Sequence, residues 1–151
     1  MTERPLYSKI LQDPILTTNF IKEKIESKVR WYQENRSRYE GKTWRSWQKK
    51  VLEIFYKENL SLEIPRYGEI VYEADCILVI EWRSPCPILE SCMKDGVETL
   101  QVCSTLYHLQ YQVLLSLIDP RLIFGRDYSH LRPYADSCRE IILLNPSTPN
   151  P

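Results

Sequence analysis

The chain has 151 residues, of which 43% are hydrophobic, and its 20 Lys and Arg balance its 20 Asp and Glu. This length and apolar content suit one folded domain and exclude a disordered chain. No apolar run approaches the roughly 20 residues that span a bilayer, and Met1–Pro5 holds no apolar signal core, so we expect a cytoplasmic protein without membrane contact.

Charge is divided unevenly along the chain. Lys and Arg outnumber Asp and Glu by thirteen to eight in residues 1–60, whereas the ratio is seven to twelve in residues 61–151. The basic half could contact an anionic partner, but a helix pair with a solvated basic face explains it more simply. Tryptophans lie among these arginines without any nucleic-acid motif, so we do not expect nucleic-acid binding.

Residues 1–60 have the pattern of a helical hairpin. An Asp-Pro start at residues 13–14 and an apolar stripe that begins at Ile15 predict a helix over residues 14–38. Gly41 interrupts the pattern. Thr43 can then cap a second helix, whose expected inward positions are Trp44, Trp47, Val51, Ile54 and Phe55.

The apolar period changes after residue 60, where strand-like runs rich in β-branched residues begin. Pro87 suits the first turn of a short helix that Gly96 ends, and residues 98–118 form a longer helical stretch. The predicted strands are residues 69–72, 76–82, 122–124 and 138–144.

Strands and helices come in blocks, which favours an α+β fold with a mostly antiparallel sheet. We predict one domain over residues 1–144, in which a helical hairpin (1–60) packs with a sheet and two further helices (61–144). Residues 145–151 hold three prolines and are predicted to be a disordered tail.

All five cysteines lie between residues 76 and 138. Their odd number and wide spacing do not form a disulfide framework, so we expect thiols or metal ligands in a reducing compartment. Cys76 and Cys92 have apolar neighbours and are predicted to lie in the core.

Cys86 precedes Pro87 and is therefore expected at the N-cap of the short helix. Free backbone N–H groups and the helix dipole would favour its thiolate, which suits a nucleophile or a metal ligand. The competing interpretation is an unreactive cysteine packed in a Pro-rigid turn. A zinc or iron–sulfur site made by Cys86, Cys103 and Cys138 is an alternative, although no CxxC spacing supports it.

Residues 125–140 are the densest polar stretch of the chain. His130 could serve as a general base beside the catalytic candidate Cys86, and arginines are suited to bind a carboxylate. The predicted substrate-binding residues are Arg126, Arg132, Tyr134 and Arg139. The simpler interpretation is a solvated hairpin with surface Arg–Asp pairs. His108 is read as an ordinary core or surface histidine.

These features follow one another in a definite order: a strand, Cys86-Pro87 opening a helix, then Cys103, and finally Cys138 on the last strand. Over residues 70–144 this order resembles the L-2-amino-thiazoline-4-carboxylic acid hydrolase family. The resemblance implies a small α+β domain that hydrolyses a small cyclic amidine-like amino acid. Only the three cysteines carry over from the family pattern. A weaker likeness is to the 4-vinyl reductase domain, a ligand-binding module.

Three functions therefore stay open at the level of sequence. The first is a small-molecule hydrolase with a thiolate-centred site that acts on a small carboxylate-bearing ligand. The second is a non-catalytic binding or sensor module that holds zinc, an iron–sulfur cluster or a small ligand through the three cysteines. The third is a protein-interaction module with ordinary core cysteines. A homo-oligomer is compatible with each.

Overall fold

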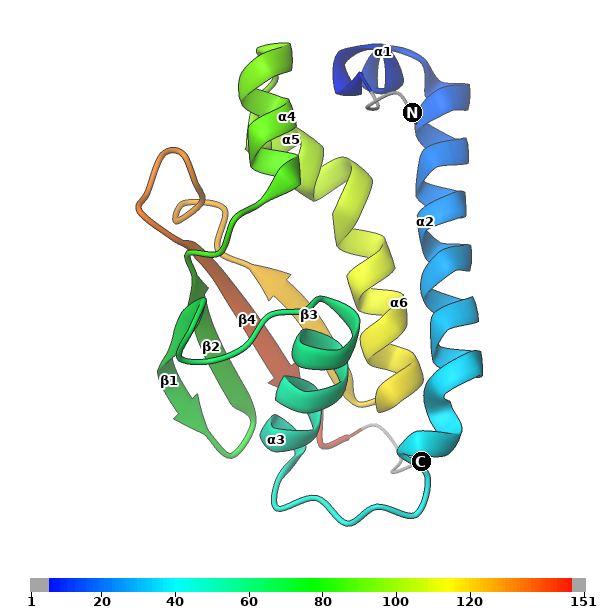
Figure 1. The fold of residues 1–151 in the computed structure, drawn as a ribbon, viewed down its shortest axis with the longest axis vertical. Coiled ribbons are helices and arrows are strands. Elements are labelled where there is room, and N and C mark those ends of the chain that lie inside the picture. The colour runs from blue at the N-terminus through cyan, green and yellow to red at the C-terminus, as the bar shows by residue number, and fades with distance from the viewer. Residues whose placement is uncertain (1–5, 148–151) are drawn as a thin grey trace.

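The computed structural model describes residues 6–147 and has an α+β fold (Figure 1). The N-terminal helices are α1 (Tyr7–Gln12), α2 (Pro14–Asn35), the short 3₁₀ turn η1 (Arg36–Arg38), α3 (Trp47–Val51) and its π-helical continuation η2 (Leu52–Asn59). The later helices are α4 (Pro87–Asp95), α5 (Thr99–Val102), the π-helical η3 (Cys103–Tyr107) and α6 (His108–Ile118).

The four strands form one antiparallel sheet in the order β1-β2-β4-β3. Their bounds are Gly68–Ala74, Ile77–Trp82, Leu122–Arg126 and Cys138–Leu144 for β1 to β4. Because side chains alternate along a strand, each strand presents one residue set to the helices and another to the outer face. The inner set is apolar and fully buried at its centre, where Leu78, Ile80 and Ile142 have no exposed surface.

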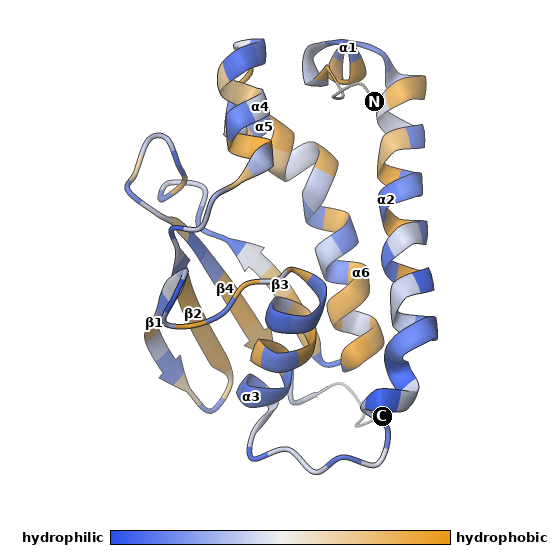
Figure 2. Cartoon of the chain, viewed as in Figure 1, coloured by the Kyte–Doolittle hydropathy of each residue, from blue (hydrophilic) through white to orange (hydrophobic). Residues whose placement is uncertain are grey.

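The helices lie on one side of this sheet (Figure 1). α6 packs on β3, and α2 packs along α6. Figure 2 shows β2 and the lower parts of β4 and α6 largely orange, whereas orange and blue bands alternate along α2. The main core follows from this arrangement, since η2, α6 and the inner face of the sheet bury Phe55, Tyr56, Leu114 and Phe124 together.

The predicted helical hairpin is wrong in its detail. α3 begins at Trp47, and its N-cap is Ser46, whose side chain accepts a hydrogen bond from the Lys49 N–H, rather than Thr43. The long helix of the predicted hairpin, α2, packs along α6 instead of pairing with α3. Ile15, expected in the apolar stripe, is 71% exposed.

The predicted short helix and its boundaries are confirmed. Pro87 occupies the first turn of α4, and Gly96 ends the helix with φ of 66°, a left-handed conformation that favours glycine. Cys92 is buried, as expected, but Cys76 is exposed, which corrects its assignment to the core. Cys76 lies in the turn between β1 and β2, before the buried part of β2 begins.

Residues 145–147 of the predicted tail form a turn, and residues 148–151 lie outside the described residues, as does Met1–Pro5. Within residues 6–147, each helix is too short or too polar to cross a lipid bilayer.

Candidate functional site

A cavity of about 200 Å³ lies where the N-terminus of α4 meets the inner face of the sheet. Its polar lining comes from segments far apart in the chain: Cys86, Cys103, Arg126, Arg132, Cys138 and Glu140. Three cysteines and two arginines that the sequence singled out therefore face one cavity. The fold brings them together although their spacing in the sequence gives no sign of it.

Cys86 is the N-cap of α4, as the sequence predicts. Its extended backbone precedes Pro87, and its Sγ accepts a hydrogen bond from the Leu89 N–H at 3.5 Å. A proline in the first turn has no N–H to satisfy and a φ already suited to a helix, so this sequence favours the arrangement. The sulfur consequently lies at the positive end of a nine-residue helix.

Cys103 has a different environment in the π-helical η3. It is 8% exposed, and burial raises the pKa of its thiol to about 12, although the nearby Arg126 charge opposes the shift. The thiol is therefore protonated at neutral pH. Short π-helical segments often occur at functional sites, and here two of them, η2 and η3, border the cavity.

Arg126 and Glu140 form a buried ion pair on the inner face of the sheet. They are cross-strand partners on β3 and β4, and Arg126 Nη2 donates to Glu140 Oε2 at 2.6 Å. Their side chains are 8% and 9% exposed. The Tyr56 hydroxyl donates to the other carboxylate oxygen at 2.8 Å. Burial alone would lower the pKa of Arg126, but the charge and hydrogen bond of Glu140, together with the nearby Cys103 and Tyr111, raise that pKa.

The remaining donors of Arg126 are not satisfied. Its Nε and Nη1 are buried and have no hydrogen-bond partner among residues 6–147. The guanidinium also lies near the rings of Phe124 and Tyr111, 5.5 and 5.8 Å from their centroids. A buried N–H without a partner is costly, so these two donors mark a place that suits an acceptor group of a ligand.

Arg132 connects two walls of the cavity. Its Nη1 donates to the Ser84 carbonyl at 2.6 Å, and its Nε donates to Cys138 Sγ at 3.2 Å. The Arg132 carbonyl in turn accepts a hydrogen bond from the Thr99 hydroxyl at 2.7 Å. This side chain therefore ties the segment that leads into Cys86 to the start of β4.

The rest of the lining is apolar. It includes Phe55, Leu60, Leu62, Trp82, Phe124 and Leu131. The Trp82 ring lies against β1 at Gly68, where an added Cβ would approach the ring to 2.6 Å. Glycine is thus needed at this position for Trp82 to form its part of the wall.

Three of the predicted site residues do not line the cavity. Tyr134 is 62% exposed, on the loop that joins β3 and β4. Arg139 lies on the outer face of the sheet, where Nε and Nη2 donate to Glu81 Oε2 at 2.9 and 2.7 Å. His130 is hydrogen-bonded to the Ser137 hydroxyl at 2.7 Å and lies 3.9 Å from Glu81.

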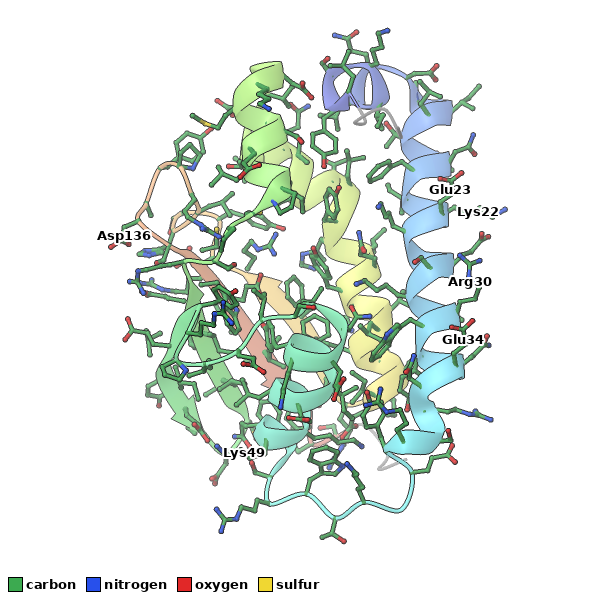
Figure 3. The ribbon with its side chains drawn as sticks, viewed as in Figure 1. Lys22, Glu23, Arg30, Glu34, Lys49 and Asp136 are labelled. Carbon is green, nitrogen blue, oxygen red and sulfur yellow. The ribbon has the colours of Figure 1, made fainter. Side chains whose placement is uncertain are left out.

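These outer residues form a polar cluster that organises the loop. Arg139 also pairs with Asp127 at 3.2 Å, and Ser137 donates to Glu81 at 3.3 Å. Figure 3 shows Asp136 at the outer edge of the loop, on the side away from the helices. The interpretation of residues 125–140 as a hairpin with Arg–acid pairs therefore describes the outer face, whereas Arg126 and Arg132 belong to the cavity.

No protein-family model, curated protein or solved structure matches this chain. The resemblance stated above consequently stays a prediction.

Sequence reasoning missed the acidic partner of the site, Glu140, and its second partner, Tyr56. The alternation Arg139-Glu140-Ile141 could have placed Glu140 on the face opposite Arg139, but not beside Arg126. His108 is, as expected, an ordinary partly buried histidine, and it does not line the cavity. Its Nδ1 lies 3.2 Å from the Tyr128 hydroxyl, and burial together with Arg126 lowers its pKa.

The three cysteines do not form a metal centre in this structure. Among residues 6–147, no group of three or more His, Cys, Asp or Glu side chains is arranged to hold a metal ion. Although Cys86, Cys103 and Cys138 share one cavity, the acid that lines it with them, Glu140, is already bound by Arg126 and Tyr56.

Proposed function

We propose that the protein binds a small carboxylate-bearing molecule in the cavity and acts on it as a hydrolase-like protein through Cys86. The observation that carries this proposal is the pair of buried, unpartnered donors of Arg126, Nε and Nη1. These two N–H groups point to different sides of the guanidinium, so each can donate one charge-assisted hydrogen bond to an acceptor such as a carboxylate oxygen. Arg132 is a poorer candidate, because its Nε and Nη1 already donate to Cys138 and to the Ser84 carbonyl.

The size of the cavity limits the ligand. A cavity of about 150 Å³ accommodates benzene, and pockets for drug-sized molecules measure about 300–1,000 Å³. The value of about 200 Å³ suits a single small ring or a short chain with one carboxylate. Apolar side chains such as Phe55 and Leu131 would enclose the part of the ligand that carries no charge.

Cys86 is the best candidate for the nucleophile among the cavity thiols. Cys103 is excluded from this role at neutral pH because its pKa is raised to about 12. Cys86 has the free N–H groups of α4 beside its sulfur, and such groups stabilise negative charge. In hydrolysis the Cys86 sulfur would add to the amidine-like carbon of the ligand, and one ring bond to that carbon would break as its heteroatom leaves with a proton from solvent. Water would then add to the same carbon, lose a proton to solvent and displace the Cys86 thiolate.

The proton transfer predicted for His130 is not part of this proposal. Its ring bonds to Ser137 on the loop and does not line the cavity. This placement also favours a second candidate, a binding or sensor module that holds the same ligand without turnover. We further propose a cytoplasmic location, since all five cysteines are free thiols.

The experiment uses L-2-amino-thiazoline-4-carboxylic acid, the compound that the sequence resemblance suggests. We expect wild-type protein to hydrolyse it, Cys86→Ala to bind it without turnover, and Arg126→Lys to raise KM by about tenfold through loss of a charge-assisted hydrogen bond from the guanidinium. Arg139→Lys is the matched control and should leave KM unchanged. Saturable binding without hydrolysis in the wild type would instead support the sensor module.

A further inference from the structure

The cavity contains a second accessible thiol, Cys138, whose surroundings differ from those of Cys86. Cys138 Sγ accepts a hydrogen bond from the charged Arg132 guanidinium at 3.2 Å, whereas Cys86 Sγ accepts one from the neutral Leu89 N–H at 3.5 Å. Hydrogen bonds from a charged donor are roughly twice as strong as neutral ones. The hydrogen bond from Arg132 therefore favours reactions of Cys138 in which its sulfur carries negative charge.

This contact is held in place from both ends of the arginine. The guanidinium donates to the Ser84 carbonyl at 2.6 Å, and the backbone carbonyl accepts from Thr99 at 2.7 Å. Cys138 is half-buried and lines the cavity, so a small reagent in the cavity meets its sulfur. Arg126, whose side chain is 8% exposed, lines the same cavity and has two unpartnered donors.

We propose that Cys138 is a site of reversible S-thiolation by small disulfides that carry a carboxylate. The carboxylate would accept a hydrogen bond from one of the free donors of Arg126 while the Cys138 sulfur attacks the nearer sulfur of the disulfide. The disulfide bond of the reagent breaks, a mixed disulfide with Cys138 forms, and the other half leaves as a thiolate. Cys138 gives its proton to solvent and is oxidised, while the leaving half is reduced.

The modification would also regulate the proposed ligand site. A carboxylate-bearing group attached to Cys138 would fill the cavity and occupy Arg126, which excludes another ligand until a thiol reductant removes it. This inference uses the cavity of the proposed function but does not require any reaction at Cys86.

The test measures thiolation in the full chain with Cys76→Ser and Cys86→Ser combined. Cys76 is exposed and would react unselectively, and serine can still cap α4 at position 86. The two probes are dithiodipropionate, which carries carboxylates, and dithiodipropionamide, a neutral disulfide of the same chain length. Mass spectrometry of digested protein then locates and times the modification.

We expect Cys138 to react with dithiodipropionate about tenfold faster than with the neutral probe, as loss of one charge-assisted contact would suggest. Cys92 and Cys103 are buried and should react far more slowly. Arg126→Lys should remove the preference between probes, while Arg139→Lys keeps it. Arg132→Lys should slow both probes. Free propionate should protect Cys138 from dithiodipropionate, a result that needs no variant of either arginine.

Equal rates with the two probes, no protection by propionate, or a Cys138 rate no higher than that of Cys103 would each overturn the proposal. Because Cys86 is absent from the tested protein, failure of hydrolysis at Cys86 cannot produce these results. Conversely, normal thiolation of Cys138 says nothing in favour of hydrolysis, so the two proposals fail separately.

Discussion

Two arginine–glutamate pairs join β4 to its two neighbouring strands, and they lie on opposite faces of the sheet. Arg126–Glu140 faces the helices and is about nine-tenths buried, whereas Arg139–Glu81 faces outward with the arginine 34% exposed. Both pairs have distances of 2.6–2.7 Å. They differ in what remains unsatisfied, since the inner arginine retains two free donors and the outer arginine also binds Asp127.

The difference shows that a good ion-pair distance does not identify a functional arginine. An exposed pair contributes little, and its donors can turn to water. A buried guanidinium cannot hydrogen-bond to water in this way, so donors that the protein leaves free are available for a ligand. The following predictions test this contrast from the largest expected effect to the smallest.

Removing the acid from each pair should separate them most clearly. Glu140→Ala leaves the Arg126 charge buried without its partner and should cost about 3–5 kcal/mol of unfolding free energy. Glu81→Ala should cost much less because Arg139 reaches solvent. Urea unfolding measures both, and combining Arg126→Met with Glu140→Leu should restore most of the loss. Equal losses from the two single changes would contradict the contrast.

A carboxylate ligand should stabilise the fold through the inner arginine alone. At a ligand concentration one hundred times Kd, the expected gain is about 2.7 kcal/mol, visible as a higher Tm. Arg126→Lys should reduce this gain strongly, and Arg139→Lys should preserve it. A gain that both variants lose equally would place the ligand elsewhere.

The pKa of His108 should be sensitive to the positive charge of Arg126. Burial and then Arg126 lower its pKa from 6.5, so the unfolded chain binds the proton more readily. Stability should fall as pH drops from about 6.5 toward the folded-state pKa. His108→Gln should flatten this decline, and imidazole NMR of the wild type should show a midpoint below 6.5. A midpoint above 6.5 would argue against the placement of Arg126.

The outer pair should give the smallest effect, at acidic pH. Hydrogen bonds from Arg139 lower the pKa of Glu81 below 4.5, despite the opposing effect of burial. Its stabilising contribution is therefore complete above pH 4.5 and is lost as pH falls through the lower folded value. Glu81→Gln should reduce the acid sensitivity of unfolding slightly. A large change would mean that the outer pair is stronger than its exposure suggests.

Local signals predicted the cap of α4 well, because Cys86, Pro87 and Gly96 act within a few residues of one another. The strands were also predicted from local patterns. The helix partners were not, since α2 meets α6 through contacts remote in sequence. Cys76 was misplaced because an apolar neighbourhood does not show where a turn ends.

The site was predicted in part for the same reason. Cys86, Cys103, Cys138, Arg126 and Arg132 do face one cavity, but nothing local separates them from Arg139, Tyr134 and His130. That distinction depends on strand register, which pairs Arg126 with Glu140 and Arg139 with Glu81. Moving a strand by one residue would exchange its two faces, so composition alone cannot identify the inner arginine.

The most direct test of the central claim is an NMR titration of the arginine Nε–H signals with a small carboxylate such as propionate. The account predicts a saturable shift of the Arg126 signal, with little change at Arg139, and loss of saturation in Arg126→Lys. Carboxylate binding that leaves the Arg126 signal unmoved would contradict it.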